Sequence, residues 1–361
     1  MRSPLDRAAI RNPFFALLAL VLLLLGLRIA LPGLIHAQLN RLLERNPKYE
    51  GTVGDVGVAL YRGAYKIHDV EIHKRGGRVP VPFAQTPLVD VSVDWGALLH
   101  GKFVGEVVAD QLQLNFVAGP TEADQQSGAA GKNEWRRLVE GLFPAQLNRF
   151  EVRNGTIHFR NFRSKPPVHL ELRDVDLVAG NLEDPAHLHT ERAGRIEARG
   201  RFEKAGYLIL HSTVDKHATE PSFNTDLIVR GVELKEWNDF LRAYANVDAE
   251  KGTVNLYAEL EAKDGQFRGY AKPFFKDVEL LGWDEKVAKQ SPLKTAWEAL
   301  VSGLLEVFKN RSEDDVAARI PITGSSKKPR GEFWPALGSA LSNAWIEALK
   351  PRLEHSVGEK H

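Results

Sequence analysis

The first hydrophobic pattern in the chain is one continuous apolar run. Residues Phe14 to Leu27 include no charged or strongly polar side chain. In water such a run has no polar face to expose, whereas in a bilayer a helix satisfies its own backbone hydrogen bonds. If the charged head of Arg28 extends toward the headgroups, the residues up to Ile35 bring the apolar length to about 22, enough to cross a bilayer. We therefore expect a transmembrane signal anchor at residues 13–35, with its membrane-facing candidates at Phe14, Leu18, Leu22 and Leu25.

The charges before this run predict its orientation. Arg2, Arg7 and Arg11 outweigh the single Asp6, and positive residues before an apolar segment favour a cytoplasmic N-terminus with the following chain translocated. Residues 1–12 are then cytoplasmic. Two alternatives are a cleaved signal peptide and a buried helix of a soluble protein. The nearest cleavage candidate, Ile35-His-Ala37, has a bulky residue where a small one is preferred, which favours the uncleaved anchor.

After a short linker helix at residues 36–50, the hydrophobic period changes from helical to two. Alternation of apolar and polar residues is typical of a sheet with one wet face and one dry face. Such segments recur through residues 51–324, so the predicted fold class is mainly β, an elongated, curled antiparallel sheet with short helices. The predicted strands lie at 53–58, 65–67, 89–93, 112–116, 150–152, 157–159, 168–172, 194–202, 207–214, 223–229, 253–262, 267–278 and 316–322.

Four segments show helical periodicity instead, at residues 134–143, 233–245, 292–308 and 334–349. The last belongs to a predicted C-terminal helical cap at 325–361. The apolar stripes of 292–308 and 334–349 have three alternative roles. They cover the dry face of the sheet, they close one end of an open groove, or they lie flat on a membrane, where Trp297, Trp334 and Trp345 suit the interfacial zone.

A six-residue pattern occurs four times. It runs apolar, basic, Asp or Gly, Val, acidic, and Ile or Leu, and it is found at 67–72, 172–177, 229–234 and 275–280. In the first two copies the apolar alternation slips by one residue within the pattern. One extra residue in an alternating strand indicates a β-bulge or a tight corner. Chance similarity in a charged, β-rich chain is the alternative.

The composition excludes several classes of function. Lys+Arg 48 against Asp+Glu 47 gives a net charge of +1, without the basic excess that attracts nucleic acid, and Cys 0 excludes thiolate chemistry and disulfides. The 12 histidines form no metal or catalytic spacing, and His187-Leu-His189 is typical of a surface loop. Asn154-Gly-Thr156 is expected to form a hairpin turn. We predict no enzyme, no catalytic residue, no metal and no cofactor.

Three motifs resemble a known family. The first is Ala318-Arg-Ile-Pro-Ile-Thr-Gly324, followed by Pro329 and the segment 334–349. The second is Val89-Asp-Val-Ser-Val-Asp-Trp95 with Leu98-Leu-His-Gly101. The third is the segment 147–159 with the Asp-Val-Asp-Leu of the second repeat copy. In this order they resemble bacterial AsmA-like envelope proteins, in the branch catalogued as a domain of unknown function.

The resemblance implies a periplasmic, β-rich protein anchored in the bacterial inner membrane, of the bridge-like lipid-transfer type. Such proteins enclose an apolar channel and are implicated in phospholipid transport and outer-membrane homeostasis. Phospholipid acyl chains, the membrane and other envelope proteins are then the expected partners. The residues expected to line the groove are Val91, Val93, Leu112, Leu114, Phe116, Ile157, Phe159, Leu170 and Leu172. The alternative is an envelope scaffold or protein-interaction module with a closed core and no lipid.

Overall fold

The computed structural model describes residues 4–93, 104–126, 146–180, 194–203, 205–215, 222–245, 247–281, 315–317 and 320–325. Within these ranges the protein is mainly β. One large sheet of 15 strands, mixed but largely antiparallel, follows an N-terminal helix. The expected helices at 134–143, 292–308 and 334–349 and the pair His187 and His189 lie outside the described residues.

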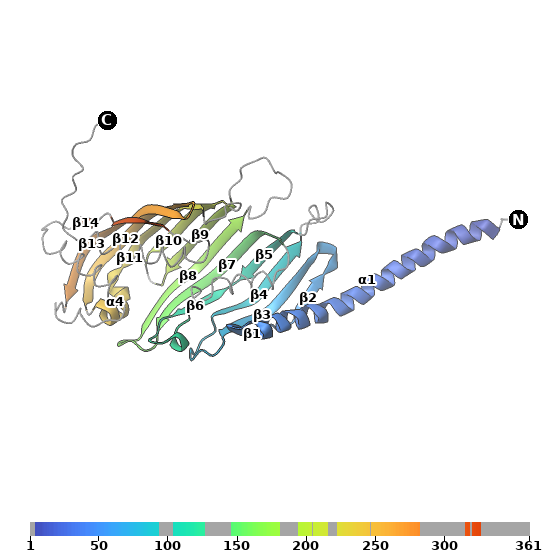
Figure 1. The fold of residues 1–361 in the computed structure, drawn as a ribbon, viewed down its shortest axis with the longest axis horizontal. Coiled ribbons are helices and arrows are strands. Elements are labelled where there is room, and N and C mark those ends of the chain that lie inside the picture. Colours follow the sequence, from blue (N-terminus) through green and yellow to red (C-terminus); the bar gives the residue numbers. More distant parts are fainter. Residues whose placement is uncertain are drawn as a thin grey trace, which may run out of the picture.

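Helix α1 (Pro4–Arg45) is continuous through the predicted anchor and most of the predicted linker. Its apolar half is exposed on every side: Leu20, Leu22 and Leu23, which point in different directions around the helix, are 51%, 59% and 60% exposed, and Leu18 and Leu25 are exposed as well. A helix that is apolar all round requires an apolar environment. The part Phe15–Arg45 is long and apolar enough to cross a membrane, a property that an anchor and a signal sequence share. The N-terminal part of α1 projects away from the sheet, and its C-terminal end lies beside β1–β3 (Figure 1).

The strands follow the predicted period of two. Their bounds are β1 (Tyr49–Thr52), β2 (Val56–Ala59), β3 (Ala64–Lys74), β4 (Ala84–Val93), β5 (Val104–Asp110), β6 (Gln113–Val117), β7 (Gln146–Asn161), β8 (Val168–Gly180), β9 (Gly194–Phe202), β10 (Tyr207–Val214), β11 (Phe223–Glu233), β12 (Asp248–Lys263), β13 (Gln266–Leu281), β14 (Asp315–Ala317) and β15 (Ile320–Ser325). Short helices are η1 (Leu60–Arg62), η2 (Glu122–Asp124), η4 (Leu234–Trp237) and α4 (Asn238–Ala245).

The sheet is built almost entirely from neighbours in sequence. Its order is β1-β3-β4-β5-β7-β8-β9-β10-β11-β12-β13-β14, with β2 on β3, β6 on β4 and β7, and β15 on β13. The pairs β5–β7 and β6–β7 are parallel, and the other pairs are antiparallel. Consequently the chain advances steadily along the long axis, from α1 at one end to β13–β14 at the other (Figure 1).

A row of left-handed residues crosses this sheet. Positive φ angles occur at the third position of all four repeat copies, at Asp69, Asp174, Gly231 and Asp277. The pairing register aligns these residues with four further positive-φ residues, Gln111, Asn154, Gly206 and Gly252. Asp, Asn and Gly are the residues that adopt this conformation at the least cost. Register shifts confirm a bulge at the second, third and fourth copies, whereas β3 keeps its register with β4 across Asp69. The repeat nevertheless has one physical cause, the left-handed residue at its third position.

The left-handed residue keeps the apolar side chains on one face. In β3, Tyr65 and Ile67 before Asp69, and Val70 and Ile72 after it, all pack in the same hydrophobic cluster. Strict alternation would have placed Val70 on the opposite face. The same shift explains Asn154. It lies inside β7 with φ 50°, so the expected hairpin turn at Asn154-Gly-Thr156 is wrong.

Replacing Asp277 tests the role of the row. Asp277→Val is expected to lower the free energy of unfolding by about 1–2 kcal/mol, because a β-branched residue is strained at positive φ. Asp277→Gly is the control, since glycine adopts φ 51° without strain. Urea unfolding of the detergent-solubilised chain, followed by circular dichroism, measures both. Equal losses in the two variants would contradict a backbone cause.

Candidate functional site

One face of the sheet is apolar across its middle strands. In β7 and β8, Phe159 lies directly opposite Leu170, and Ile157 lies opposite Leu172. Register carries the same face onward through Phe202, Leu208 and Val229. We call this surface the apolar face. Its members include Ile157, Phe159, Leu170, Leu172, Leu177, Ile196, Leu208, Leu210, Leu227, Val229 and Leu256, all of them half-buried.

Helix α1 closes the end of this face nearest the N-terminus. Leu43, which is 0% exposed, and Leu39 pack in one cluster with Ile67 and Val91. The aromatic pair Tyr49 and Phe83, with ring centroids 5.5 Å apart, belongs to the same cluster. The C-terminal turns of the apolar helix therefore lie directly on the first strands of the apolar face.

The predicted groove residues divide into three groups. Leu112, Leu114 and Phe116 are half-buried and pack against the cluster under α1, whereas Val91 is buried within that cluster as a core residue. Ile157, Phe159, Leu170 and Leu172 lie on the half-buried part of the face. Val93 stands at the end of β4 and borders a polar hollow on the opposite face.

A short helical segment covers part of the apolar face between β7 and β12. The ring of Phe240 in α4 lies 6.1 Å from that of Phe159, and the ring of Trp237 in η4 lies 5.9 Å from that of Phe202. Leu241 packs beside Leu234, Ala249 and Phe275. The residues of β9–β12 on this face extend the predicted groove beyond the sites that the sequence singled out.

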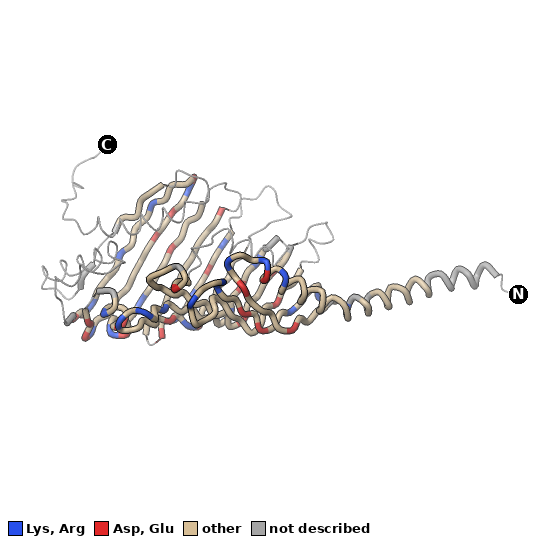
Figure 2. The backbone as a smooth tube through the Cα atoms, turned by 60° about the horizontal axis from the view of Figure 1, so that its bottom comes forward, with Lys and Arg blue, Asp and Glu red and all other residues tan. Residues whose placement is uncertain are grey.

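The opposite face is charged and largely paired. Arg199 contacts Asp176 at 3.0 Å, and Arg201 pairs with Asp174 on the same two strands. Charged residues follow the strands along the sheet rather than gathering at one end (Figure 2). Such ion pairs at a surface contribute about 0–1 kcal/mol each, and they indicate a face that lies in water.

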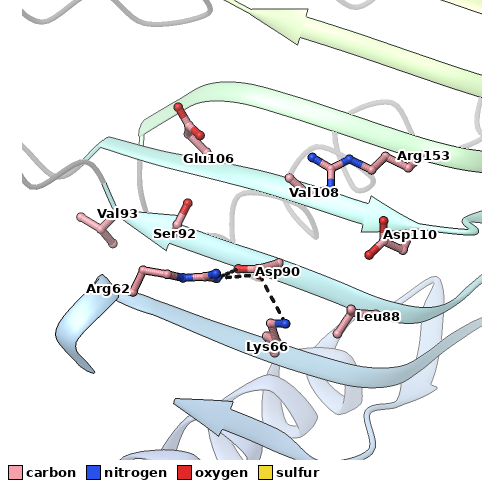
Figure 3. A pocket seen from close by; sticks show the side chains of 10 residues that line it. All are labelled: Arg62, Lys66, Leu88, Asp90, Ser92, Val93, Glu106, Val108, Asp110 and Arg153. Carbon is pink, nitrogen blue, oxygen red and sulfur yellow. Dashed lines mark hydrogen bonds and ion pairs between the residues drawn. The ribbon is translucent and has the colours of Figure 1, made fainter. Parts of the chain in front are cut away.

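A hollow of about 570 Å³ lies on this charged face. Three basic and three acidic side chains line it, so their formal charges balance. Arg62 donates to both oxygens of Asp90, at 2.7 and 2.6 Å, and Lys66 is 3.9 Å from the same carboxylate. Glu106, Asp110 and Arg153 are the other charged residues of the lining (Figure 3). Because the cations and carboxylates neutralise one another, the hollow has the character of a surface ion-pair network rather than a ligand site.

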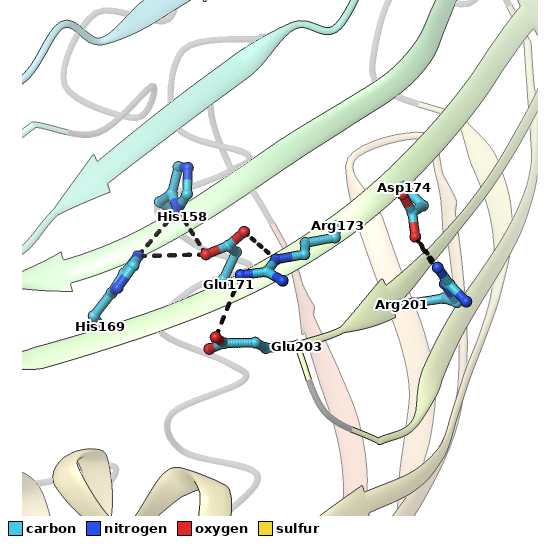
Figure 4. Close-up of polar contacts among 7 residues, drawn as sticks. All are labelled: His158, His169, Glu171, Arg173, Asp174, Arg201 and Glu203. Atoms are coloured by element: carbon cyan, nitrogen blue, oxygen red, sulfur yellow. Dashed lines mark hydrogen bonds and ion pairs between the residues drawn. The ribbon is translucent and has the colours of Figure 1, made fainter.

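Register also brings together three residues that the sequence did not single out. His158 in β7 lies directly opposite Glu171 in β8, and His169 is two pairs further along, opposite Arg160. His158 Nδ1 is 3.1 Å from His169 Nε2 and 3.7 Å from Glu171 Oε2. Figure 4 shows the three side chains converging. Their spacing in sequence reveals nothing, since only the hairpin pairing makes them neighbours.

The surroundings of this cluster shift its pKa values. Burial, followed by the positive charge of Arg160, lowers the pKa of His158 to about 4. Burial acts to raise the pKa of Glu171, but the hydrogen bond and charge of Arg173, with the two histidines, outweigh it and hold that pKa below its ordinary value. At neutral pH His158 is therefore neutral and Glu171 is ionised.

The low pKa of His158 predicts a pH dependence of stability. Between about pH 6.5 and pH 4 the unfolded chain binds a proton at His158 that the folded chain does not, so the free energy of unfolding falls as the pH falls. At pH 4 the loss attributable to His158 is about 2–3 kcal/mol. Urea unfolding in EDTA, compared between the wild type and His158→Gln, measures it. The variant should show a shallower slope, and equal slopes would contradict the assignment.

Comparisons with known proteins identify no family for the chain. No protein-family model matches it, and no curated protein sequence matches it significantly. The functional proposal therefore depends on the residues and their geometry.

Proposed function

We propose that the chain is a membrane-anchored periplasmic protein of the bacterial envelope whose apolar face forms a curled groove for phospholipid acyl chains. The main support is the half-buried aliphatic surface that runs unbroken from β7 to β12, beginning where α1 ends. An acyl chain gains about 0.8 kcal/mol for each CH₂ removed from water. A surface a few side chains wide and many strands long suits an extended hydrocarbon chain.

The position of α1 supports a function close to the bilayer. In this proposal its exposed apolar half lies in the inner membrane, with the N-terminus in the cytoplasm. Its last turns pack on the apolar face through Leu39 and Leu43. The same helix thus links the hydrocarbon of the bilayer to the first strands of the groove. AsmA-like proteins, which the sequence motifs resemble, are lipid-transfer proteins of this general type.

The length of the sheet limits the role of a single chain. The twelve strands of the main path, at about 4.8 Å each, extend roughly 55 Å. We propose that the protein accepts or delivers lipid locally, or continues into a partner, rather than joining two membranes alone.

Photocrosslinking in the membrane tests the proposal without removing the anchor. Leu210 belongs to the apolar face, and its neighbour His211 points to the charged face. A benzophenone amino acid at Leu210 should give phospholipid adducts in mass spectra of the digested full-length protein. The same label at His211 is the matched control. Lipid adducts at His211 but not at Leu210, or at neither position, would contradict the lipid proposal. Either result would favour the envelope scaffold, which is supported by the closed core around Leu43.

A further inference from the structure

The cluster of His158, His169 and Glu171 lies on the charged face, opposite the proposed groove, and lipid binding makes no use of it. Phe159 and Leu170 belong to the apolar face, so their sequence neighbours His158, His169 and Glu171 project from the other side of the same hairpin. Two imidazoles and a carboxylate are the donor set that borderline divalent metals such as zinc prefer.

The three donor atoms are spaced as they would be around one ion. His158 Nδ1 and His169 Nε2 are 3.1 Å apart, and Glu171 Oε2 is 3.7 Å from the first and 3.9 Å from the second. The point equidistant from all three atoms lies about 2.1 Å from each, which is the length of zinc bonds to histidine nitrogen and carboxylate oxygen. All three donor atoms lie within 4.8 Å of one another.

The neighbouring residues hold the donors in place. Arg173 donates to Oε1 of Glu171 and leaves Oε2 facing the histidines. Arg173 also contacts Glu203 at 3.3 Å, so its own charge is shared between two carboxylates. Such contacts orient metal ligands and raise the affinity of a site. His158 is fixed by burial, its side chain being 9% exposed.

A simple hydrogen bond between the two imidazoles also accounts for their 3.1 Å separation, with one ring as donor and the other as acceptor. It does not account for the carboxylate oxygen that faces both rings. The positive charge of Arg160 opposes a cation here, and its guanidinium is held by the hydrogen bond that it donates to Asn115 Oδ1 at 2.6 Å. The neutral state of His158 at pH 7 leaves its ring available as a ligand.

We propose that His158, His169 and Glu171 bind one zinc-type divalent ion on the charged face of the β7–β8 hairpin. The site supplies three protein ligands. His169 is 48% exposed along its side chain, so the fourth coordination position opens to solvent. Zinc sites with three ligands and one open position exchange that position with water or with an added donor. The proposed groove and this site are on opposite faces and are tested separately.

Metal titration of the full-length chain in detergent tests the site. After treatment with EDTA and removal of the chelator, Zn²⁺ is titrated in competition with a chromophoric indicator. We expect one equivalent bound, and Co²⁺ should give the visible absorption of a four-coordinate site. His169→Ala, at an exposed position, should weaken binding at least tenfold, and Glu171→Gln should do the same. Arg173→Ala is expected to weaken it less, because Arg173 only positions Glu171.

His73→Ala is the matched control. His73 contacts Glu71 at 2.5 Å in β3 and provides a histidine–carboxylate pair without a second histidine. If zinc binds only at this and other surface pairs, His73→Ala and His169→Ala will have equal effects. That result, or less than one equivalent bound by the wild type, would overturn the proposal. Circular dichroism of each variant separates loss of the ligand from loss of the fold.

Discussion

Leu227→Asp should reduce phospholipid adducts at a label on Leu210 by at least tenfold. Leu227 in β11 lies directly opposite Leu210 in β10 on the apolar face. A carboxylate there must keep its hydration, so it interrupts the hydrocarbon contact of an acyl chain and adds a negative charge near a phospholipid. Mass spectrometry of the crosslinked full-length protein gives the adduct yield.

The adjacent residue provides the control. Ile228 projects from the opposite face of β11, where it pairs with Ile209. Ile228→Asp makes the same change from an aliphatic side chain to a carboxylate, only one residue away. We expect it to leave the adduct yield within about twofold of the unsubstituted value. If both substitutions reduce the yield equally, lipid does not distinguish the two faces and the groove proposal fails. Unfolding curves for both variants confirm that the sheet is intact.

Leu43→Ala is expected to cost about 2–5 kcal/mol in the free energy of unfolding. Leu43 is 0% exposed and lies at the centre of the cluster that joins α1 to the sheet. Its truncation leaves a cavity between α1 and the first strands of the sheet. No other described helix contributes side chains to this cluster. Urea unfolding of the detergent-solubilised chain measures the loss.

Two further variants identify the cause of the loss. Leu43→Met nearly conserves the volume and should cost less than about 1.5 kcal/mol. Leu34→Ala truncates a leucine of the same helix that is 64% exposed, and it should leave the unfolding of the sheet unchanged. Alanine is at least as good a helix former as leucine, so a large loss from Leu34→Ala would mean that stability does not depend specifically on packing at the sheet.

Strand positions were predictable because a sheet with one wet and one dry face records its period in the sequence. The predicted segments 194–202 and 207–214 coincide with β9 and β10. β5 was missed because its inward residues Gly105, Val107 and Ala109 are mostly small, while Val108 is apolar on the charged face. Apolar and polar residues therefore do not alternate clearly in this strand.

Properties that depend on cross-strand register were much less predictable. The repeat indicated a bulge because its apolar alternation slips by one residue, but Gln111 and Asn154 join the row only through pairing. The histidine cluster is similar, since 11 residues separate His158 from His169. Of the predicted groove residues, Val91 proved to be core because α1 folds onto the first strands. Nothing in the alternation of β4 indicates which partner covers it.

The row of left-handed residues also determines how a sheet of this kind changes its size. The left-handed residues of neighbouring strands lie at the same level of the sheet. An added hairpin with such residues would therefore continue both the row and the apolar face without altering its neighbours. Length then grows by about 10 Å for each pair of strands, while the cross-section stays constant. Stability in such nearest-neighbour architectures is a sum over units. The fold is thus modular: duplication of one hairpin yields a longer protein with the same internal profile.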